Sequence, residues 1–364
     1  MLDVKGFINC KAYMRFKPLI TASGFLVING KLIYVGDEDR VIKLANDLGG
    51  ELVDLRGKVV LPGFIDAHLH LTALGESLRS IDLRGVKSID DVKRILRDYS
   101  LKSDDYWLVD YGWDQELFPN GRLISRSDLD EAVSNRPVIL VRSCMHVAVL
   151  NSKALSDLRL LERFKSSPDF LPSEGVVREE ILYTIMEGMR RDLRKVVNDL
   201  KVSIDHLLAN GVTTVGFVEC DLQSFYALQL IKMTYGLPIR IRLYLSSKYL
   251  GAISNLGVLG GLGDDHLKLQ GIKLFIDGSL GARMALLSQP YNDSEESYGV
   301  QVISRNELIK ALNIAFNHEL QVAIHAIGDK AIDIALSAYI ETFGNVSKYR
   351  PVSYTHLRAH ETRH

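Results

Sequence analysis

Cysteine is scarce in this sequence. Among 364 residues there are three cysteines, Cys10, Cys144 and Cys220, and they lie far apart. A small, odd number of scattered cysteines excludes a disulfide framework and is typical of a protein from the reducing cytoplasm. Residues 1–20 carry scattered charges without the apolar core of a signal peptide. We therefore expect a cytoplasmic location.

Long apolar runs and an excess of charge of one sign are absent as well. No segment approaches the roughly eighteen uncharged apolar residues of a membrane-spanning helix, and the net charge is −1. We therefore expect no membrane partner and no nucleic acid partner. There is no GxSxG elbow, no Walker A loop and no GxGxxG after a strand. These absences argue against a serine nucleophile and the common nucleotide-binding loops.

What the sequence does contain is an alternation of strands and helices in its second half. Such alternation predicts an α/β fold with parallel strands joined by right-handed crossovers. Strands are expected over 211–220, 239–245, 271–278 and 321–328, and helices over 221–236, 304–319 and 329–344. Residues 1–57 have the pattern of short strands, with Asn29-Gly30 in a tight hairpin turn. An almost continuously apolar strand is expected over 58–71, covered on both faces.

That apolar strand ends in a pair of histidines. In a strand, alternate residues point to the same face, so Asp66, His68 and His70 share one side. Two imidazoles on alternate residues can bind one metal ion, or they can simply fill hydrogen-bonding positions. The end of a buried strand is where barrel and open α/β folds place their chemistry, which makes the metal as good an explanation as the hydrogen bonds.

Two further polar residues lie within apolar strands. Lys273 points opposite to the aliphatic row of GIKLFIDG, and Asp277 on the same face is too far along the strand for easy pairing. Such a lysine either reaches the rim of the fold or is a desolvated amine that reacts with carbon dioxide to give a metal-bridging carbamate. His325 in QVAIHAIGD likewise points away from the aliphatic row, as a core residue or as a ligand. His146 either contacts substrate or caps a turn.

Four stretches carry a family resemblance: GKVVLPGFIDAHLHL, DLDEAVSNRPVILVRSCMHVAVLNSKAL, GIKLFIDGSLGARMA and QVAIHAIGDKAID. The chain resembles the metal-dependent amidohydrolase superfamily, and within it the YtcJ-like branch related to N-substituted formamide deformylases. The resemblance runs in the family's order from about residue 25 to residue 344. It implies a (β/α)₈ TIM barrel, a β-sandwich built from both chain ends, and a large insertion after the first barrel strand.

The resemblance also implies a site and a reaction. His68, His70, Lys273 and His325 match the family's metal ligands, with Lys273 carboxylated and one or two divalent ions bound, zinc being expected. The implied reaction is hydrolysis of an amide-type, non-peptide C–N bond in a small molecule by a metal-activated hydroxide. His146 and Asp277 are the expected substrate contacts, and a homodimer is expected for the full-length parent. Alternatives are a cyclic amide or enamide substrate, or a non-catalytic binding protein.

The C-terminal residues depart from the family pattern. Three histidines, His356, His360 and His364, suggest a metal site at first sight, but residues 352–362 read like a translated DNA-sequencing adapter. We expect a chain truncated near residue 350, with residues 351–364 a non-native tail. The expected organisation is then part of a β-sandwich over 1–57 and an incomplete barrel over 58–350, with about five barrel strands and the insertion at 72–205. The family's catalytic aspartate would lie beyond the truncation, so we expect this chain to be inactive.

Overall fold

The computed structural model describes residues 2–119, 121–144, 146–188, 193–280, 283–292, 296–344 and 352–353. The chain divides into two compact units, Met1–Ile65 with Gly211–Thr214, and Asp66–Asn210 with Val215–His364. Within the described ranges, no helix has both the length and the apolar character needed to cross a membrane.

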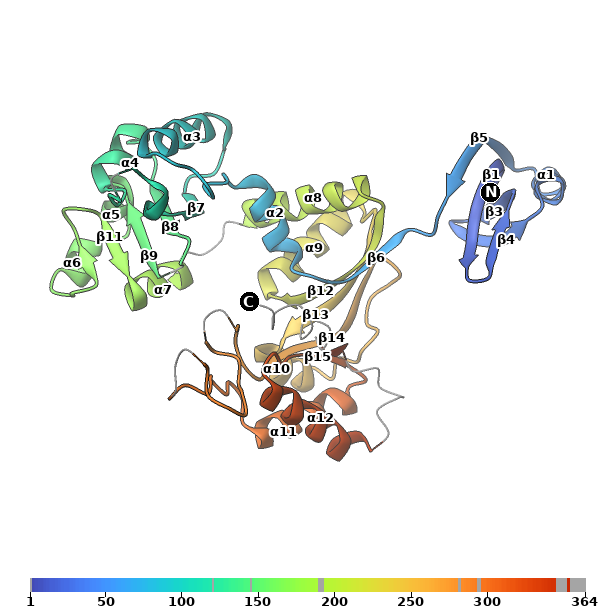
Figure 1. Cartoon of the computed structure of the whole chain (residues 1–364). Helices are drawn as coiled ribbons and strands as arrows, with labels where there is room; N and C mark the ends of the chain where they lie inside the picture. Colours follow the sequence, from blue (N-terminus) through green and yellow to red (C-terminus); the bar gives the residue numbers. More distant parts are fainter. Residues whose placement is uncertain are drawn as a thin grey trace. The chain divides into compact units, whose positions relative to one another are not determined.

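The first unit is built on a five-stranded sheet, drawn in blue in Figure 1. Its strands are β1 (Val4–Phe16), β2 (Leu19–Ala22), β3 (Gly24–Ile28), β4 (Lys31–Gly36) and β5 (Glu51–Val60), with helix α1 (Glu38–Asp47) beside them. Pairing is antiparallel except between β1 and β5. Asn29 and Gly30 join β3 to β4 with φ of 48° and 73°. These positive values are typical of a two-residue hairpin turn, which confirms the predicted turn.

The predicted insertion forms a second sheet, in the order β10-β11-β9-β8-β7. Its strands are β7 (Leu108–Trp113), β8 (Val138–Arg142), β9 (Val147–Leu150), β10 (Phe170–Leu171) and β11 (Val176–Arg178). The helices around it are α3 (Ile89–Lys102), α4 (Arg126–Ala132), α5 (Ser152–Asp157), α6 (Leu160–Phe164) and α7 (Glu179–Gly188), with a 3₁₀ turn η1 (Gln115–Leu117). The Ser88 side chain accepts the Asp91 N–H and caps α3. Apolar clusters lie on both faces of the sheet, with Trp113 in one and Leu150 in the other.

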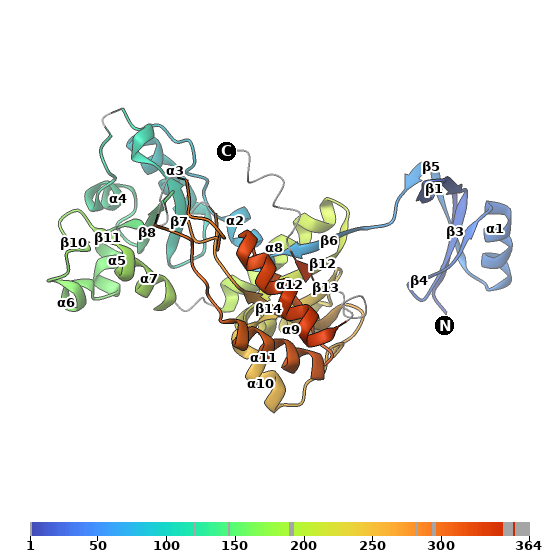
Figure 2. The same cartoon turned by 60° about the horizontal axis from the view of Figure 1, so that its bottom comes forward.

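The third sheet is a parallel half-barrel and confirms the predicted incomplete TIM barrel. Its strands, in the order β6-β12-β13-β14-β15-β16, are β6 (Phe64–Leu69), β12 (Val212–Cys220), β13 (Arg240–Ser246), β14 (Leu267–Phe275), β15 (Gln321–His325) and β16 (Val352–Ser353). The helices between them are α2 (Leu71–Arg79), α8 (Leu193–Ala209), α9 (Leu222–Tyr235), α10 (Leu250–Asn255), α11 (Arg305–Asn317) and α12 (Asp329–Phe343), with a 3₁₀ turn η2 (Ser247–Tyr249). Figure 2 shows α11 and α12 side by side over this sheet.

The strand expected over 58–71 differs from the observed structure. The apolar run is divided at Pro62-Gly63, so that β5 ends at Val60 in the first sheet and β6 begins at Phe64 in the half-barrel. Ile65 is 70% exposed, although the sequence predicted a strand covered on both faces. The physical reason is position, because β6 is the edge strand of its sheet. His70 lies just beyond the strand and is the N-cap residue of α2.

Helix α2 packs closely on α8, and this contact fixes the segment that follows the His68/His70 pair. A Cβ atom at Gly75 would lie 1.9 Å from the carbonyl oxygen of Asp199, so only glycine allows the approach. Arg79 Nη1 donates to the buried carboxylate of Asp199 at 2.6 Å and ties the end of α2 to the same helix.

Strand β16 lies within 351–364, the segment expected to be a non-native tail. Its two residues pair in parallel with β15, with Val352 opposite Ala323 and Ser353 opposite Ile324. The other residues of the segment, with His356, His360 and His364, fall outside the described part of the chain.

Candidate metal and substrate site

The four predicted metal ligands lie at or just beyond the carboxyl ends of three half-barrel strands. His68 is the penultimate residue of β6, Lys273 is near the end of β14, and His325 is the last residue of β15. Strand register places Phe275 opposite His325 on the neighbouring strand. Because the carboxyl ends of parallel strands share one edge of a barrel, these residues line the edge where such folds hold their chemistry.

The histidine pair has a spacing that suits one ion. The ring centroids of His68 and His70 are 5.4 Å apart, with the rings inclined at 75°. Two imidazoles on one tetrahedral zinc, each with a bond of about 2.1 Å, would have centroids about 5.3 Å apart. Burial lowers the pKa of His70, and the Lys273 charge lowers it further while Glu219 opposes both. His70 is therefore neutral at pH 7, which is the form that binds a metal.

Lys273 is one of the largest buried side chains, with 2% of its surface exposed. Its Nζ lies 5.1 Å from the centroid of the Phe275 ring. Burial lowers the pKa of Lys273 from 10.5 to about 8, against the opposing influence of the Glu219 charge. A lysine in such surroundings loses its proton far more readily than one in water.

His325 presents a buried nitrogen. Its ring centroid lies 5.2 Å from that of Phe275. Its Nε2 is buried and has no hydrogen-bond partner among the described residues, although it lies 3.9 Å from Oδ1 of Asp277. Burial is the main cause that lowers the pKa of His325, and the Lys273 charge adds to it. A buried polar atom left without a partner is costly unless a ligand satisfies it.

These donors fit a divalent ion in their chemistry, since neutral imidazoles and carboxylates are the ligands that zinc takes in catalytic sites. In the described ranges, no three His, Cys, Asp or Glu side chains are grouped closely enough to hold an ion. The fit therefore depends on the unpartnered Nε2 of His325 and on the spacing of the histidine pair.

Asp277 lies at the same edge, and its carboxylate is held by the backbone. It accepts N–H groups from Leu286 at 2.9 Å, Ile327 at 3.0 Å and Gly328 at 2.7 Å, and it is 1% exposed. The carboxylate thus anchors the loop after β14 to the segment after β15. The predicted contact of Asp277 with substrate stays a prediction.

His146 lies in the insertion, next to β9. Its Nδ1 is 3.1 Å from Oε2 of Glu179 and 3.2 Å from the hydroxyl of Tyr183. About half of the side chain is exposed, and His146 does not line the cavity described next. Its predicted contact with substrate also stays a prediction.

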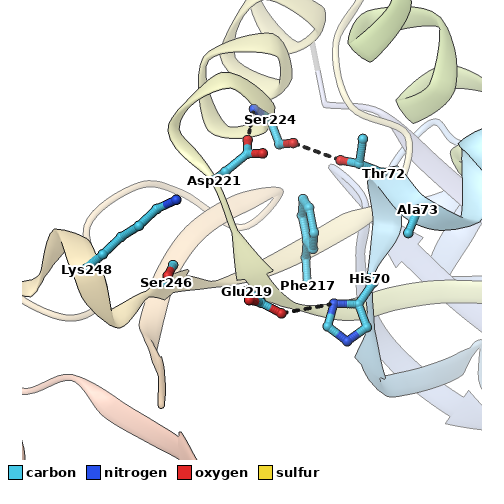
Figure 3. Close-up of a pocket in the computed structure, with 9 residues that line it drawn as sticks. All are labelled: His70, Thr72, Ala73, Phe217, Glu219, Asp221, Ser224, Ser246 and Lys248. Carbon is cyan, nitrogen blue, oxygen red and sulfur yellow. Dashed lines mark hydrogen bonds and ion pairs between the residues drawn. The ribbon is translucent and has the colours of Figure 1, made fainter. Parts of the chain in front are cut away.

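A cavity of about 260 Å³ opens beside His70, as Figure 3 shows. Its walls come from the ends of β12 and β13 and from the first turns of α2 and α9: His70, Thr72, Ala73, Phe217, Glu219, Asp221, Ser224, Ser246 and Lys248. The Thr72 and Ser224 hydroxyls are 2.8 Å apart, which joins the two helix starts.

The sequence analysis missed six of the seven polar residues that line the cavity, all except His70. Glu219, Ser246 and Lys248 belong to no motif. The available signal was position, since Glu219 is the penultimate residue of β12 and Ser246 is the last residue of β13, and both strands were predicted from the sequence to within one residue.

The parallel half-barrel has the fold of solved metal-dependent hydrolases. Two solved structures agree with this. An uncharacterized metal-dependent hydrolase from Pyrococcus furiosus is 38% identical, with a TM-score of 0.82 over 93% of this chain and 70% of its own. One from Pyrococcus horikoshii OT3 is 37% identical, with a TM-score of 0.83 over 93% of this chain and 68% of its own.

Residues 51–362 match the amidohydrolase family Amidohydro_3, and the chain belongs to this family. Among curated relatives, the putative amidohydrolase YtcJ of Bacillus subtilis is 28% identical over 91% of this chain and 64% of its own length. The protein LONG AFTER FAR-RED 3 of Arabidopsis thaliana is 30% identical over 87% of this chain and 58% of its own length. The N-substituted formamide deformylase of Arthrobacter pascens is 24% identical over 87% and 62%. The chain thus spans about three fifths of the length of these relatives.

Proposed function

We propose that the protein is a metal-dependent hydrolase that cleaves amide-type, non-peptide C–N bonds in small molecules. The observation that carries the proposal is the buried Nε2 of His325, which has no hydrogen-bond partner in the described part of the chain and lies at the strand edge that also holds His68 and His70. Family membership supports the reaction class. The name of one relative, an N-substituted formamide deformylase, supports an amide-type substrate.

In this proposal His68, His70 and His325 hold one or two divalent ions, with zinc the expected metal. A bound ion supplies an acidified water and polarises the substrate carbonyl. Lys273 contributes as an amine, or as the carbamate that forms when the neutral amine adds to carbon dioxide and releases a proton. Its burial and lowered pKa support this second form.

The cavity residues take the role of orienting the substrate. The hydroxyls of Thr72, Ser224 and Ser246 line the cavity and are suited to hydrogen-bond an amide group. Lys248 adds a cation with no carboxylate partner among the described residues. A cavity of about 260 Å³ accommodates a small molecule and excludes a folded polypeptide.

Metal binding tests the proposal most directly. The wild-type chain, dialysed against Zn²⁺ and then against metal-free buffer, should retain one or two ions by elemental analysis, and a chelator should lower its melting temperature. His325→Ala should lose at least one ion, whereas His206→Ala, on the exposed side of α8, should match the wild type.

Hydrolysis tests the chemistry itself. Because this chain is expected to be inactive, the assay uses the full-length parent protein, in which amine release from a panel of N-substituted formamides and aryl amides should require the metal and should disappear in His68→Ala. A wild-type chain that binds no metal would contradict the proposal. Hydrolysis that is equal in the wild type and in His68→Ala would contradict it as well.

A further inference from the structure

Glu219 has an unusual backbone and an unusual environment. It is the penultimate residue of β12, between Val218 and Cys220, which are 1% and 0% exposed. Its own φ is 57°, in the left-handed region. For a residue with a Cβ atom this conformation costs about 1–3 kcal/mol and persists only where the surrounding structure imposes it. Strained residues of this kind cluster at functional sites, and the Glu219 side chain lines the cavity.

The carboxylate of Glu219 lies close to the histidine pair. Its Oε2 is 4.0 Å from Nδ1 of His70, and Figure 3 shows the two side chains turned toward each other. Two donors bound at about 2.1 Å to one tetrahedral ion are about 3.4 Å apart. A rotation of either side chain that shortens the present distance by about 0.6 Å would bring both donors to one ion.

Glu219 also acts on residues of other strands. Its negative charge raises the pKa of Lys273 on β14 and of His325 on β15, as well as that of His70. It therefore lies within electrostatic reach of predicted ligands from three different parts of the sheet. The influence of the Glu219 charge is therefore not confined to His70.

We infer that Glu219 is a direct ligand of the metal centre, where it supplies an oxygen donor between the His68/His70 pair and Lys273. The inference rests on the proposed function, because it presupposes that these residues bind a metal. The negative charge of Glu219 offsets part of the charge of a divalent ion, which neutral imidazoles cannot do. Residue 219 thus adds to the site a ligand that the sequence pattern had not indicated.

Glu219→Gln tests the assignment, because glutamine keeps the shape of the side chain and removes its charge. By chelator competition, the affinity for Zn²⁺ should fall by more than about 100-fold, beyond the loss of about 10–100-fold typical of residues that only orient a ligand. The visible absorption spectrum of the Co²⁺-loaded chain should also change, because the coordination of the ion changes. Glu219→Asp keeps the carboxylate and should recover part of the affinity.

Glu319→Gln is the matched control. Glu319 is also exposed and has a φ of 54°, but it lies outside the cavity. This variant should match the wild type in affinity and in spectrum. Circular dichroism of each variant identifies any loss of folding.

The possible outcomes are distinct. Wild-type affinity and spectrum in Glu219→Gln would overturn the inference and leave the proposed function intact. Weaker affinity with an unchanged Co²⁺ spectrum would overturn it too, and would make Glu219 a residue that positions His70. A wild-type chain that binds neither Zn²⁺ nor Co²⁺ would overturn the proposed function, and the inference with it.

Discussion

Replacing Asp110 with asparagine should change how the stability of the insertion depends on pH. Asp110 lies in β7 and is fully buried. One carboxylate oxygen accepts the Ile81 N–H at 3.0 Å, while the other has no hydrogen-bond partner among the described residues. Burial raises the pKa of Asp110 from 3.8 to about 6, helped by the charge of Asp105 and opposed by the Ile81 hydrogen bond and by Lys195.

The size and sign of the effect follow from this pKa. The folded chain holds the Asp110 proton more tightly than the unfolded chain, so the protonated carboxyl stabilises the fold. This contribution to the free energy of unfolding is fully present below about pH 4 and is lost as the pH rises through about 6. One pKa unit corresponds to about 1.4 kcal/mol, so the loss approaches about 3 kcal/mol above pH 7. Asparagine does not titrate. The free energy of unfolding of Asp110→Asn, relative to the wild type, should therefore rise by about 3 kcal/mol between pH 4 and pH 8.

Urea unfolding followed by tryptophan fluorescence measures this difference. The two tryptophans of the chain, Trp107 and Trp113, both lie in the insertion, so the signal reports on the part that contains Asp110. Asp104→Asn is the control, because Asp104 is exposed in the same segment. A wild-type-to-variant difference that stays constant within about 0.5 kcal/mol from pH 4 to pH 8 would refute the reasoning.

Two further substitutions probe the packing around the site. Gly75→Ala should lower the free energy of unfolding by about 1–3 kcal/mol, because the new methyl group would meet the carbonyl oxygen of Asp199. The control is Gly251→Ala, which has open space around it and should be neutral or slightly stabilising in the same urea assay. Asp277→Asn should destabilise the chain by about 2 kcal/mol, because it weakens three charge-assisted hydrogen bonds to backbone N–H groups. Asp277→Asn should also speed proteolysis in the loop after β14, whereas the control Asp333→Asn, at an exposed position, should not. An unchanged cleavage rate in Asp277→Asn would show that the carboxylate does not hold the loop.

Local patterns were sufficient to predict the alternating strands and helices of a parallel sheet, whereas the barrel itself was implied by the family resemblance. The strands after residue 211 are marked by apolar runs, and two of the helices begin at polar caps, Asp221 before α9 and Ser304 before α11. These signals depend on neighbouring residues, so a single sequence contains them. The alternation of side chains along each strand also predicted that His68, Lys273 and His325 point away from the aliphatic side, and the family resemblance grouped them as one set of ligands.

The features that the sequence did not reveal depend on long-range contacts. The five short strands of the insertion pair across separations that no local pattern records. Glu219 looks like an ordinary solvated residue until the fold places it beside His70. The division between β5 and β6 did have a local signal, Pro62-Gly63, but the apolar residues on either side concealed it.

The anchor at Asp277 has a consequence for how such a protein can evolve. The residues that precede it include Lys273, and the residues that it holds follow His325, so one buried carboxylate fixes the base of the loop to the strands that carry both predicted ligands. Changes farther along the loop then leave the ligand positions undisturbed. The rest of the loop can therefore vary in sequence and length while the two strand ends keep their positions.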